Sequence, residues 1–256
     1  MIKILVIGEL CVDRFVYGLV KRMSPEAPVP VLNPVEITEN EGMAGNVVAN
    51  LKSLVDGIDV VHWYQTTRIE KIRFVEKKSN HMFIRVDEGE LKPIDTLSFL
   101  SREQRRTINE SDVVIISDYD KGFLSNDIIK EISKQASITI LDSKRKLTRD
   151  IIEDITFIKL NESEYENNKE LVNEKTDKFI ITLGSKGAMY LETIHSSNNP
   201  QDTIDVSGAG DTFVASFALK YLKTENVIES IEYANDVCAD VVNKKGVVTP
   251  DSKFKL

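Results

Sequence analysis

The chain has 256 residues, of which 41% are hydrophobic and 29% charged, so it can form one hydrophobic core and is too apolar to be disordered. Its 33 basic and 41 acidic residues give a net charge of −8, which argues against a nucleic acid or an anionic membrane as the main partner. Two cysteines are too few for a disulfide framework, and the N-terminal apolar run is too short for a signal peptide or a membrane span. We therefore expect a single cytoplasmic domain with no nucleic-acid or membrane partner.

The N-terminal third of the chain predicts one buried strand and then a small, partly exposed sheet. Residues 2–7 are mostly apolar, which is typical of a strand covered on both faces. Prolines in and beside residues 29–38 suit an edge strand rather than a central one. Residues 69–76 also favour a strand, and in residues 82–87 apolar and polar side chains alternate, which indicates a strand with one covered face. We expect these last three segments to form a sheet that stands apart from the main layer.

The remaining two thirds predict a parallel sheet that is covered by helices. Four more short apolar runs are bounded by Gly, Asp or Asn, and residues at helical spacing follow most of them. These runs are residues 112–116, 138–141, 157–160 and 179–183. Apolar residues also recur at helical spacing over 213–221 and 227–242, which predicts two consecutive amphipathic helices, and the polar stretch 196–203 predicts a surface loop. The pattern as a whole indicates an α/β fold.

The most informative motif is the string DVSGAGDT at residues 205–212, directly before the first of these two helices. A glycine-rich turn that opens a helix leaves backbone N–H groups unpaired, and with the helix dipole they favour a phosphate or a developing anion. Asp211 lies in the first helical turn, where its carboxylate could accept a proton from an attacking hydroxyl. Short glycine motifs also occur by chance, so the same residues could instead form a simple helix cap.

This motif resembles the C-terminal signature of ribokinase-like sugar kinases, the PfkB family. Six further strings resemble one branch of that family, the D-glycero-β-D-manno-heptose 7-phosphate kinases, and follow its order along nearly the whole chain. They are residues 13–18, 22–30, 42–46, 117–122, 142–144 and 161–164. The resemblance implies a three-layer α/β/α sandwich with a mostly parallel sheet and a small β lid, formed by the 29–38, 69–76 and 82–87 segments.

On the nucleotide side, the resemblance implies a kinase that uses ATP and Mg²⁺, with Asp211 as the catalytic base. The anion hole then consists of Gly208, Ala209 and Gly210. Glu164, together with Asn161, corresponds to an element that holds Mg²⁺ through water, although Asn161 could also simply cap a helix with an acidic first turn. The other residues that the resemblance places at ATP are Lys144, Thr182, Gly184, Gly187, Asn235 and Gly246. From composition alone, these could be a solvated lysine and a set of turn and packing residues.

On the acceptor side, the resemblance implies that Asp13 and Asn46 grip sugar hydroxyls. Lys71, Arg73 and Arg85 lie where the heptose branch presents cations to its substrate, and such side chains suit a phosphoryl group. Charges on an exposed strand could equally be solvated edge protection. The apolar row of the 82–86 strand is exposed for a monomer, so we expect the lid to pair with a second copy in a homodimer.

The implied function is ATP-dependent phosphorylation of a hydroxyl, at C1, of a sugar phosphate such as D-glycero-β-D-manno-heptose 7-phosphate. Two alternatives stay open: a ribokinase-fold kinase for another sugar or a nucleoside, and a degenerate nucleotide-binding protein with a regulatory role. Two departures from the family bear on this choice. Met43 replaces the second residue of a Gly-Gly pair and would be strained at positive φ, and between residues 54 and 66 the chain lacks about a strand and a helix.

Overall fold

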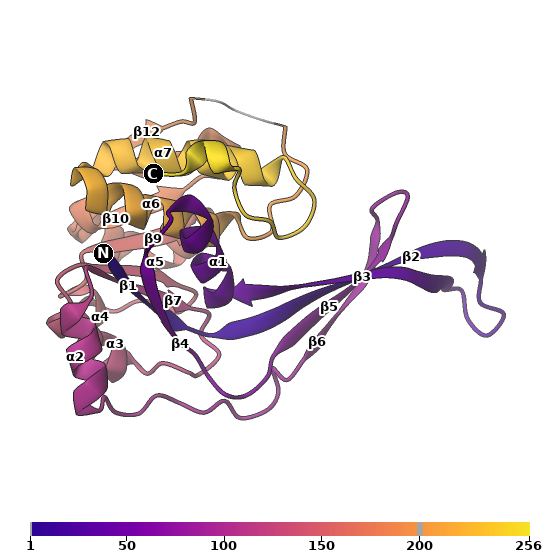
Figure 1. Ribbon diagram of the computed structural model, residues 1–256, viewed down its shortest axis with the longest axis horizontal. Coiled ribbons are helices and arrows are strands. Elements are labelled where there is room, and N and C mark those ends of the chain that lie inside the picture. The colour runs from indigo at the N-terminus through magenta and orange to yellow at the C-terminus, as the bar shows by residue number, and fades with distance from the viewer. Residues whose placement is uncertain (1, 199–201) are drawn as a thin grey trace.

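The computed structural model describes residues 2–198 and 202–256, which form a three-layer body and a separate four-stranded sheet (Figure 1). The main sheet has the strand order β12-β11-β10-β9-β8-β7-β1-β4, and its strands from β10 to β4 run parallel. Its strands are β1 (Lys3–Gly8), β4 (Asp59–Trp63), β7 (Val113–Asp118), β8 (Thr139–Ser143), β9 (Phe157–Asn161), β10 (Phe179–Thr182), β11 (Ala188–Tyr190) and β12 (Thr193–His195). The five apolar runs of the sequence are β1, β7, β8, β9 and β10, so these predictions are confirmed.

Helices cover both faces of the main sheet, and one hydrophobic core lies on each side. In β1, Ile4 and Val6 point into one core and Leu5 and Ile7 into the other, because successive side chains of a strand alternate between faces. The first core is closed by α1 (Ala44–Leu54), α6 (Ala209–Thr224) and α7 (Val227–Val242). The second is closed by α2 (Arg102–Glu110), α3 (Asn126–Gln135), α4 (Arg149–Ile152) and α5 (Glu162–Glu174). The predicted α/β sandwich and its two C-terminal helices are confirmed.

Three short 3₁₀ turns and one polar stretch complete the described chain. The turns are η1 (Thr176–Lys178), η2 (Gly184–Lys186) and η3 (Ser252–Phe254). The predicted loop at 196–203 lies partly outside the described residues, and its described part contains no helix or strand. Among the helices of 2–198 and 202–256, none is both long and apolar enough to cross a membrane.

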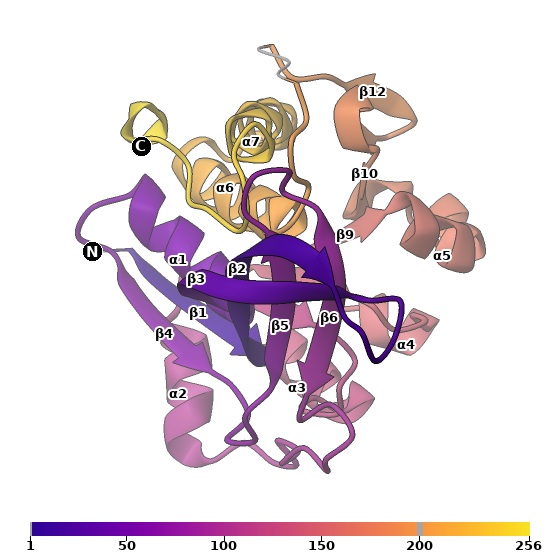
Figure 2. The ribbon, with the colours of Figure 1, turned by 90° about the vertical axis from the view of Figure 1, so that its right-hand side faces the viewer.

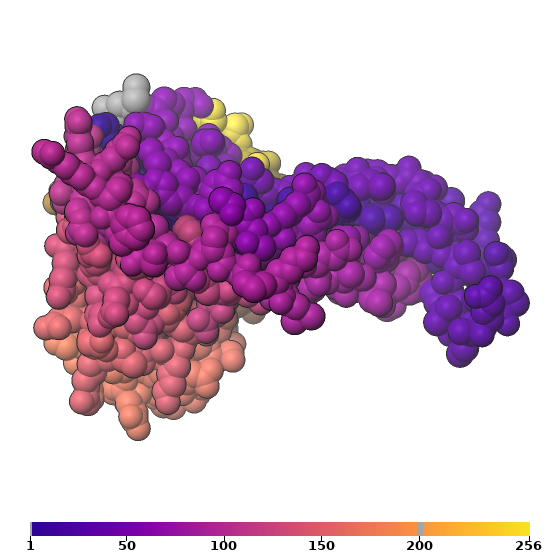
Figure 3. Space-filling view, turned by 90° about the horizontal axis from the view of Figure 1, so that it is seen from below, coloured from indigo at the N-terminus to yellow at the C-terminus, as the bar shows by residue number. Residues whose placement is uncertain are grey.

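The four-stranded sheet, called the lid below, projects from the body as an arm (Figures 1 and 3). In the order β3-β2-β5-β6, its strands are β3 (Pro30–Met43), β2 (Leu10–Met23), β5 (Glu70–Glu76) and β6 (Met82–Glu88). The sequence predicted three of these strands but missed β2, and it ended β3 five residues early. One residue separates β1 from β2, and charged residues interrupt β2, so no apolar run marks it as a separate strand.

The two faces of the lid differ in chemistry, as the strand register shows. One cross-strand row consists of Thr38, Phe15, Arg73 and Arg85. The next row along the strands points to the opposite face and consists of Ile37, Val16, Phe74 and Ile84. We call the face with the first row the cleft face, because Lys71 on it lies over Tyr119 of the body, and the face with the second row the outer face. Figure 2 shows the four lid strands in front of the body. Ile37 and Ile84 are 59% and 56% exposed. The expectation that one face of the 82–87 strand is covered is therefore wrong for the single chain, because no further layer packs against the outer face within the described residues.

Candidate functional site

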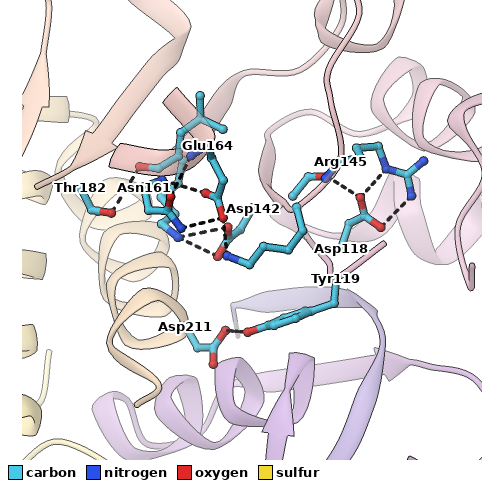
Figure 4. Close-up of polar contacts among 12 residues, drawn as sticks. Asp118, Tyr119, Asp142, Arg145, Asn161, Glu164, Thr182 and Asp211 are labelled. Carbon is cyan, nitrogen blue, oxygen red and sulfur yellow. Dashed lines mark hydrogen bonds and ion pairs between the residues drawn. The ribbon is translucent and has the colours of Figure 1, made fainter. Parts of the chain in front are cut away.

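Asp211 lies in the first turn of α6, at the C-terminal edge of the parallel strands and facing the cleft (Figure 4). Its side chain is buried, and two groups from distant parts of the chain bind it. The amide Nδ2 of Asn46 donates to Oδ2 at 3.0 Å, and the hydroxyl of Tyr119 donates to Oδ1 at 2.9 Å. Burial raises the pKa of Asp211 to about 6, although both hydrogen bonds favour the ionised form. The carboxylate can therefore accept a proton near neutral pH.

The glycine turn before α6 brings its backbone close to Asn46. Gly208 has a φ of 79°, and a Cβ at this position would lie 2.5 Å from Nδ2 of Asn46, so only glycine fits there. The N–H of Ala209 donates to the carbonyl of Val206 at 3.2 Å and is not free for an anion. The N–H groups of Gly208 and Gly210 have no acceptor within the described part of the chain. Two of the three predicted anion-hole amides are thus available.

Two adjoining cavities lie beside this turn and share lining residues. The first, of about 210 Å³, is lined mostly by apolar atoms and includes four predicted ATP residues, which are Thr182, Gly184, Gly187 and Asn235. The second, of about 600 Å³, is more polar and contains Lys144, Asn161 and Asp211. Thr182, Gly184 and Gly210 line both cavities. An apolar pocket that opens into a polar one beside a helix N-terminus suits a nucleotide with its phosphates toward Asp211.

Asn161 and Glu164 form a capping box at the start of α5. The side chain of Asn161 accepts from the N–H of Glu164 at 2.9 Å, and Glu164 accepts from the N–H of Asn161 at 2.8 Å. Lys144 forms an ion pair with Glu164. The helix-cap role that the sequence left open for Asn161 is therefore present, and Glu164 lies behind the cavity wall. Carboxylate and amide oxygens are the ligands that Mg²⁺ takes, often through water, so this pair fits that ion.

A buried ion pair that the sequence analysis missed lies beside the glycine turn. Nζ of Lys159 is 3.1 and 3.2 Å from the two carboxylate oxygens of Asp142, and both side chains line the larger cavity. Burial opposes the charged form of Lys159, but the carboxylates of Asp142, Glu164 and Asp211 together outweigh it and raise the pKa of the lysine. A Cβ on Gly210 would lie 3.1 Å from Nζ of Lys159, which places this cation beside the free amides. The signal was present as the polar residue inside the apolar run 157–160.

Of the predicted acceptor residues, Asn46 lies in α1, and the other four lie on the cleft face of the lid, where most already have partners. Arg73 forms an ion pair with Asp13 and stacks on Phe15, with 4.8 Å from its guanidinium carbon to the ring centroid. Arg85 is bound to Asp87 of its own strand at 2.8 Å and is exposed. Lys71 forms no ion pair with a carboxylate of the described residues. It lies over the ring of Tyr119, with 5.6 Å from Nζ to the centroid.

Gly246 is separated from the other predicted ATP residues. Its φ of 75° and a 3.0 Å hydrogen bond from its N–H to Asp205 turn the chain toward the lid. There it lines a hollow of about 360 Å³ together with Phe15, Tyr17 and Asn40. Gly246 therefore lines neither of the two cavities that contain the other predicted ATP residues, and its role at ATP stays a prediction. Sequence order could not show this, because the turn depends on a carboxylate 41 positions away.

Met43 adopts the backbone conformation that its replacement of a glycine led us to expect. Its φ is 57° and its ψ is −132° at the residue before α1, and its side chain is buried. This region is favoured by glycine, so the conformation is strained. The strain lies three residues before Asn46, and the hydrogen bond from Asn46 to Asp211 is nevertheless made.

Comparison with known protein families gives a match over most of the chain. A model described as "pfkB family carbohydrate kinase" matches residues 46–253. The bifunctional protein HldE of Helicobacter pylori (strain J99) is 30% identical over 299 aligned positions, which cover 96% of this chain and 64% of that protein. The HldE of Mesorhizobium japonicum is 29% identical over 296 positions, which cover 96% of this chain and 59% of that protein. The chain thus spans about three fifths of the length of these relatives. Each alignment also contains about 50 positions at which this chain has no residue, so this chain is shorter than the relatives within the matched region itself.

Solved structures show the same fold at low sequence identity. The ribokinase of Arabidopsis thaliana, solved with ribose and ATP, superposes with a TM-score of 0.72 at 15% identity, over 99% of this chain and 97% of the ribokinase. A carbohydrate kinase from Agrobacterium tumefaciens gives a TM-score of 0.71 at 17% identity, over 98% of this chain and 95% of that one. These similarities establish the architecture, whereas the family match concerns the activity.

Proposed function

Because the chain belongs to the pfkB family of carbohydrate kinases and has a ribokinase-like fold, we propose that it phosphorylates the C1 hydroxyl of a sugar phosphate such as D-glycero-β-D-manno-heptose 7-phosphate. The observation that carries this proposal is the buried Asp211 carboxylate, which faces a polar cavity beside the glycine turn. The likeness to HldE proteins and the cations on the cleft face of the lid support the sugar phosphate as acceptor.

Asp211 accepts the proton of the attacking hydroxyl in the proposed reaction. With a pKa of about 6 it is mostly ionised near neutral pH and is still basic enough to take part in the transfer. The free N–H groups of Gly208 and Gly210 face the same cavity and stabilise negative charge on the transferred phosphoryl group. Phosphoryl transfer depends mainly on positioning and charge neutralisation, and these groups supply both.

ATP is the proposed phosphoryl donor, with its base in the apolar cavity and its phosphates in the polar one. Lys144 would turn from Glu164 toward the phosphates, and Lys159 adds a fixed positive charge beside the glycine turn. Mg²⁺, when bound, neutralises charge on the phosphates. Glu164 would hold it through water without losing the capping bonds to Asn161.

The acceptor is proposed to lie between the cleft face of the lid and Asp211. Lys71 has a free charge at this place, and Arg73 is oriented by Asp13 and Phe15, so these two cations are the best phosphate anchors. Arg85 lies farther out and is already neutralised by Asp87, and we assign it an auxiliary role. Asp13 and Asn46 keep their proposed contacts with sugar hydroxyls.

The outer face of the lid supports a homodimer. Ile37, Val16, Phe74 and Ile84 form an apolar row across all four strands, and a second lid would remove this row from water. The compartment is proposed to be the cytoplasm, where ATP is available and where the two free cysteines would stay reduced.

Phosphorus-31 NMR of the reaction product tests the proposal. With ATP, Mg²⁺ and a heptose 7-phosphate, we expect ADP and a second sugar phosphate resonance that couples to the anomeric proton. A product phosphorylated elsewhere, or turnover only with an unphosphorylated sugar or a nucleoside, would assign the chain to another acceptor. ATP binding without turnover of any acceptor would favour a regulatory role.

A further inference from the structure

Tyr119 contacts the proposed base and also lies beside two lysines, one proposed to bind the acceptor and the other to bind ATP. Its hydroxyl donates to Oδ1 of Asp211 at 2.9 Å. Nζ of Lys71, from the lid, is 5.6 Å from the centroid of its ring, and Nζ of Lys144, from the nucleotide side, is 5.7 Å from it. Burial raises the pKa of Tyr119 well above its ordinary value, so the hydroxyl remains a donor at every pH at which the protein would be assayed.

A buried carboxylate fixes the backbone that carries Tyr119. Glu9 has no exposed surface and accepts hydrogen bonds from the N–H groups of Tyr119, Lys121 and Phe123 at 2.9, 3.1 and 3.2 Å. This loop follows β7 directly, so it begins from the rigid centre of the main sheet. The ring therefore approaches Asp211 from a fixed position, and the contact does not depend on a mobile side chain.

From this geometry we propose that Tyr119 is a positioning residue, which orients the Asp211 carboxylate and holds it in the ionised form that accepts a proton. The inference rests on the proposed role of Asp211 as the base. Asn46 binds one carboxylate oxygen and Tyr119 the other, so the plane of the carboxylate is fixed from both sides. Each oxygen keeps a second lone pair for the acceptor hydroxyl.

The groups around Asp211 show why a donated hydrogen bond matters there. Burial and the nearby Asp142 carboxylate favour the neutral acid, whereas Asn46, Tyr119 and Lys159 favour the carboxylate. The thiol of Cys11, on the lid side, is neutral because burial raises its pKa to about 12. Few groups therefore keep Asp211 ionised, and Tyr119 and Asn46 are the only hydrogen-bond donors to its side chain among the described residues.

The test is the pH dependence of kcat/KM for Tyr119→Phe. The variant keeps the ring and its contacts with Lys71 and Lys144 but removes the hydroxyl. We expect the acidic limb of the profile to move up by about one pH unit, with activity returning to near the wild-type level above the limb. Tyr190→Phe is the matched control, because its hydroxyl donates to the carbonyl of Asp177 at 3.1 Å, outside the cleft. An equal loss of kcat/KM at every pH would indicate a merely structural role and overturn the proposal.

A direct titration separates this inference from the proposed function. In protein labelled with carbon-13 at aspartate side chains, the Asp211 resonance is identified by its absence in Asp211→Asn, and its titration needs no turnover. We expect the apparent pKa to be higher in Tyr119→Phe than in the wild type. An unchanged titration contradicts the inference even if the enzyme is active. A shifted titration in a protein that turns over no sugar supports the role of Tyr119 and contradicts the proposed function instead.

Discussion

The amide of Asn46 in α1 donates to the carboxylate of Asp211 in α6, and these two residues are 165 positions apart in the chain. Buried polar groups extend this contact. Asn50 donates to the side-chain oxygen of Asn46 at 3.1 Å, and Thr212 donates to Asn50 at 3.1 Å. The proposed base is thus held by the packing of α1 on α6, so changes at the start of α1 should affect activity before they affect the fold.

The first prediction concerns the stability cost of the proposed base. Burial raises the pKa of Asp211 from 3.8 to about 6, so the folded chain binds more protons than the unfolded chain between these values. Stability should therefore fall as the pH rises through this window. The difference in unfolding free energy between Asp211→Asn and the wild type should therefore be about 1–3 kcal/mol more favourable to the variant at pH 7 than at pH 4. Urea unfolding at both pH values measures this difference, and equal differences would show that Asp211 is not perturbed by burial.

The second prediction concerns Gly208, which has positive φ and no room for a side chain. Gly208→Ala should lower kcat by roughly tenfold or more, because the new Cβ displaces Asn46 from Asp211. Gly57→Ala is the matched control: its φ is 71°, but no atom lies within 4 Å of the added Cβ. Both variants should lose about 1 kcal/mol of unfolding free energy through backbone strain. If both variants lost turnover equally, the contact with Asn46 would not be the cause.

The third prediction concerns the anchor for the acceptor phosphate. Lys71→Ala and Arg73→Ala should each raise KM for the sugar phosphate by roughly ten- to a hundredfold, since a hydrogen bond to a charged group is lost. KM for ATP should change little, because both residues lie on the lid. Arg68→Ala is the control, since Arg68 is an exposed cation that is bound to Glu70. A rise in KM for ATP alone would show that these cations bind the nucleotide and would contradict their role as anchors for the acceptor phosphate.

The fourth prediction concerns the outer face of the lid. Ile84→Lys should convert the proposed dimer to a monomer, because a charge would then lie at the exposed β6 end of the apolar row. Ile228→Lys, at a residue of α7 that is 46% exposed, should leave the assembly unchanged. Light scattering at micromolar concentration distinguishes the two states. A wild-type protein that is monomeric with and without ligands would refute the lid interface.

The main sheet could be predicted from the sequence because its strands are buried on both faces and appear as continuous apolar runs. Strand β2 could not, because its pattern mixes buried charges such as Asp13 with apolar residues. Asp13 is buried only because Arg73, 60 positions later, lies beside it. Such a pair is a property of the strand register, which a single sequence does not show.

The candidate site was predicted where a local motif carries the chemistry and missed where distant residues create it. The glycine turn and Asp211 lie within one string, so their arrangement follows from local backbone geometry. Tyr119 directly follows β7 and Lys159 lies within β9, and only the folded sheet brings these two residues to the same cavity. Lys159 gave only the weak signal of a charged residue inside an apolar run, and Tyr119 gave none, because a tyrosine after a strand is common.

The most direct measurement is ADP release with a heptose 7-phosphate and with the corresponding unphosphorylated heptose, for the wild type and for Asp211→Asn. We predict that the wild type turns over the phosphorylated sugar and that it turns over the free sugar at least roughly tenfold more weakly. At neutral pH, the rate of Asp211→Asn should be lower than that of the wild type by a factor of about 10²–10⁴. Equal rates on both sugars, or an Asp211→Asn variant that turns over like the wild type, would contradict the account.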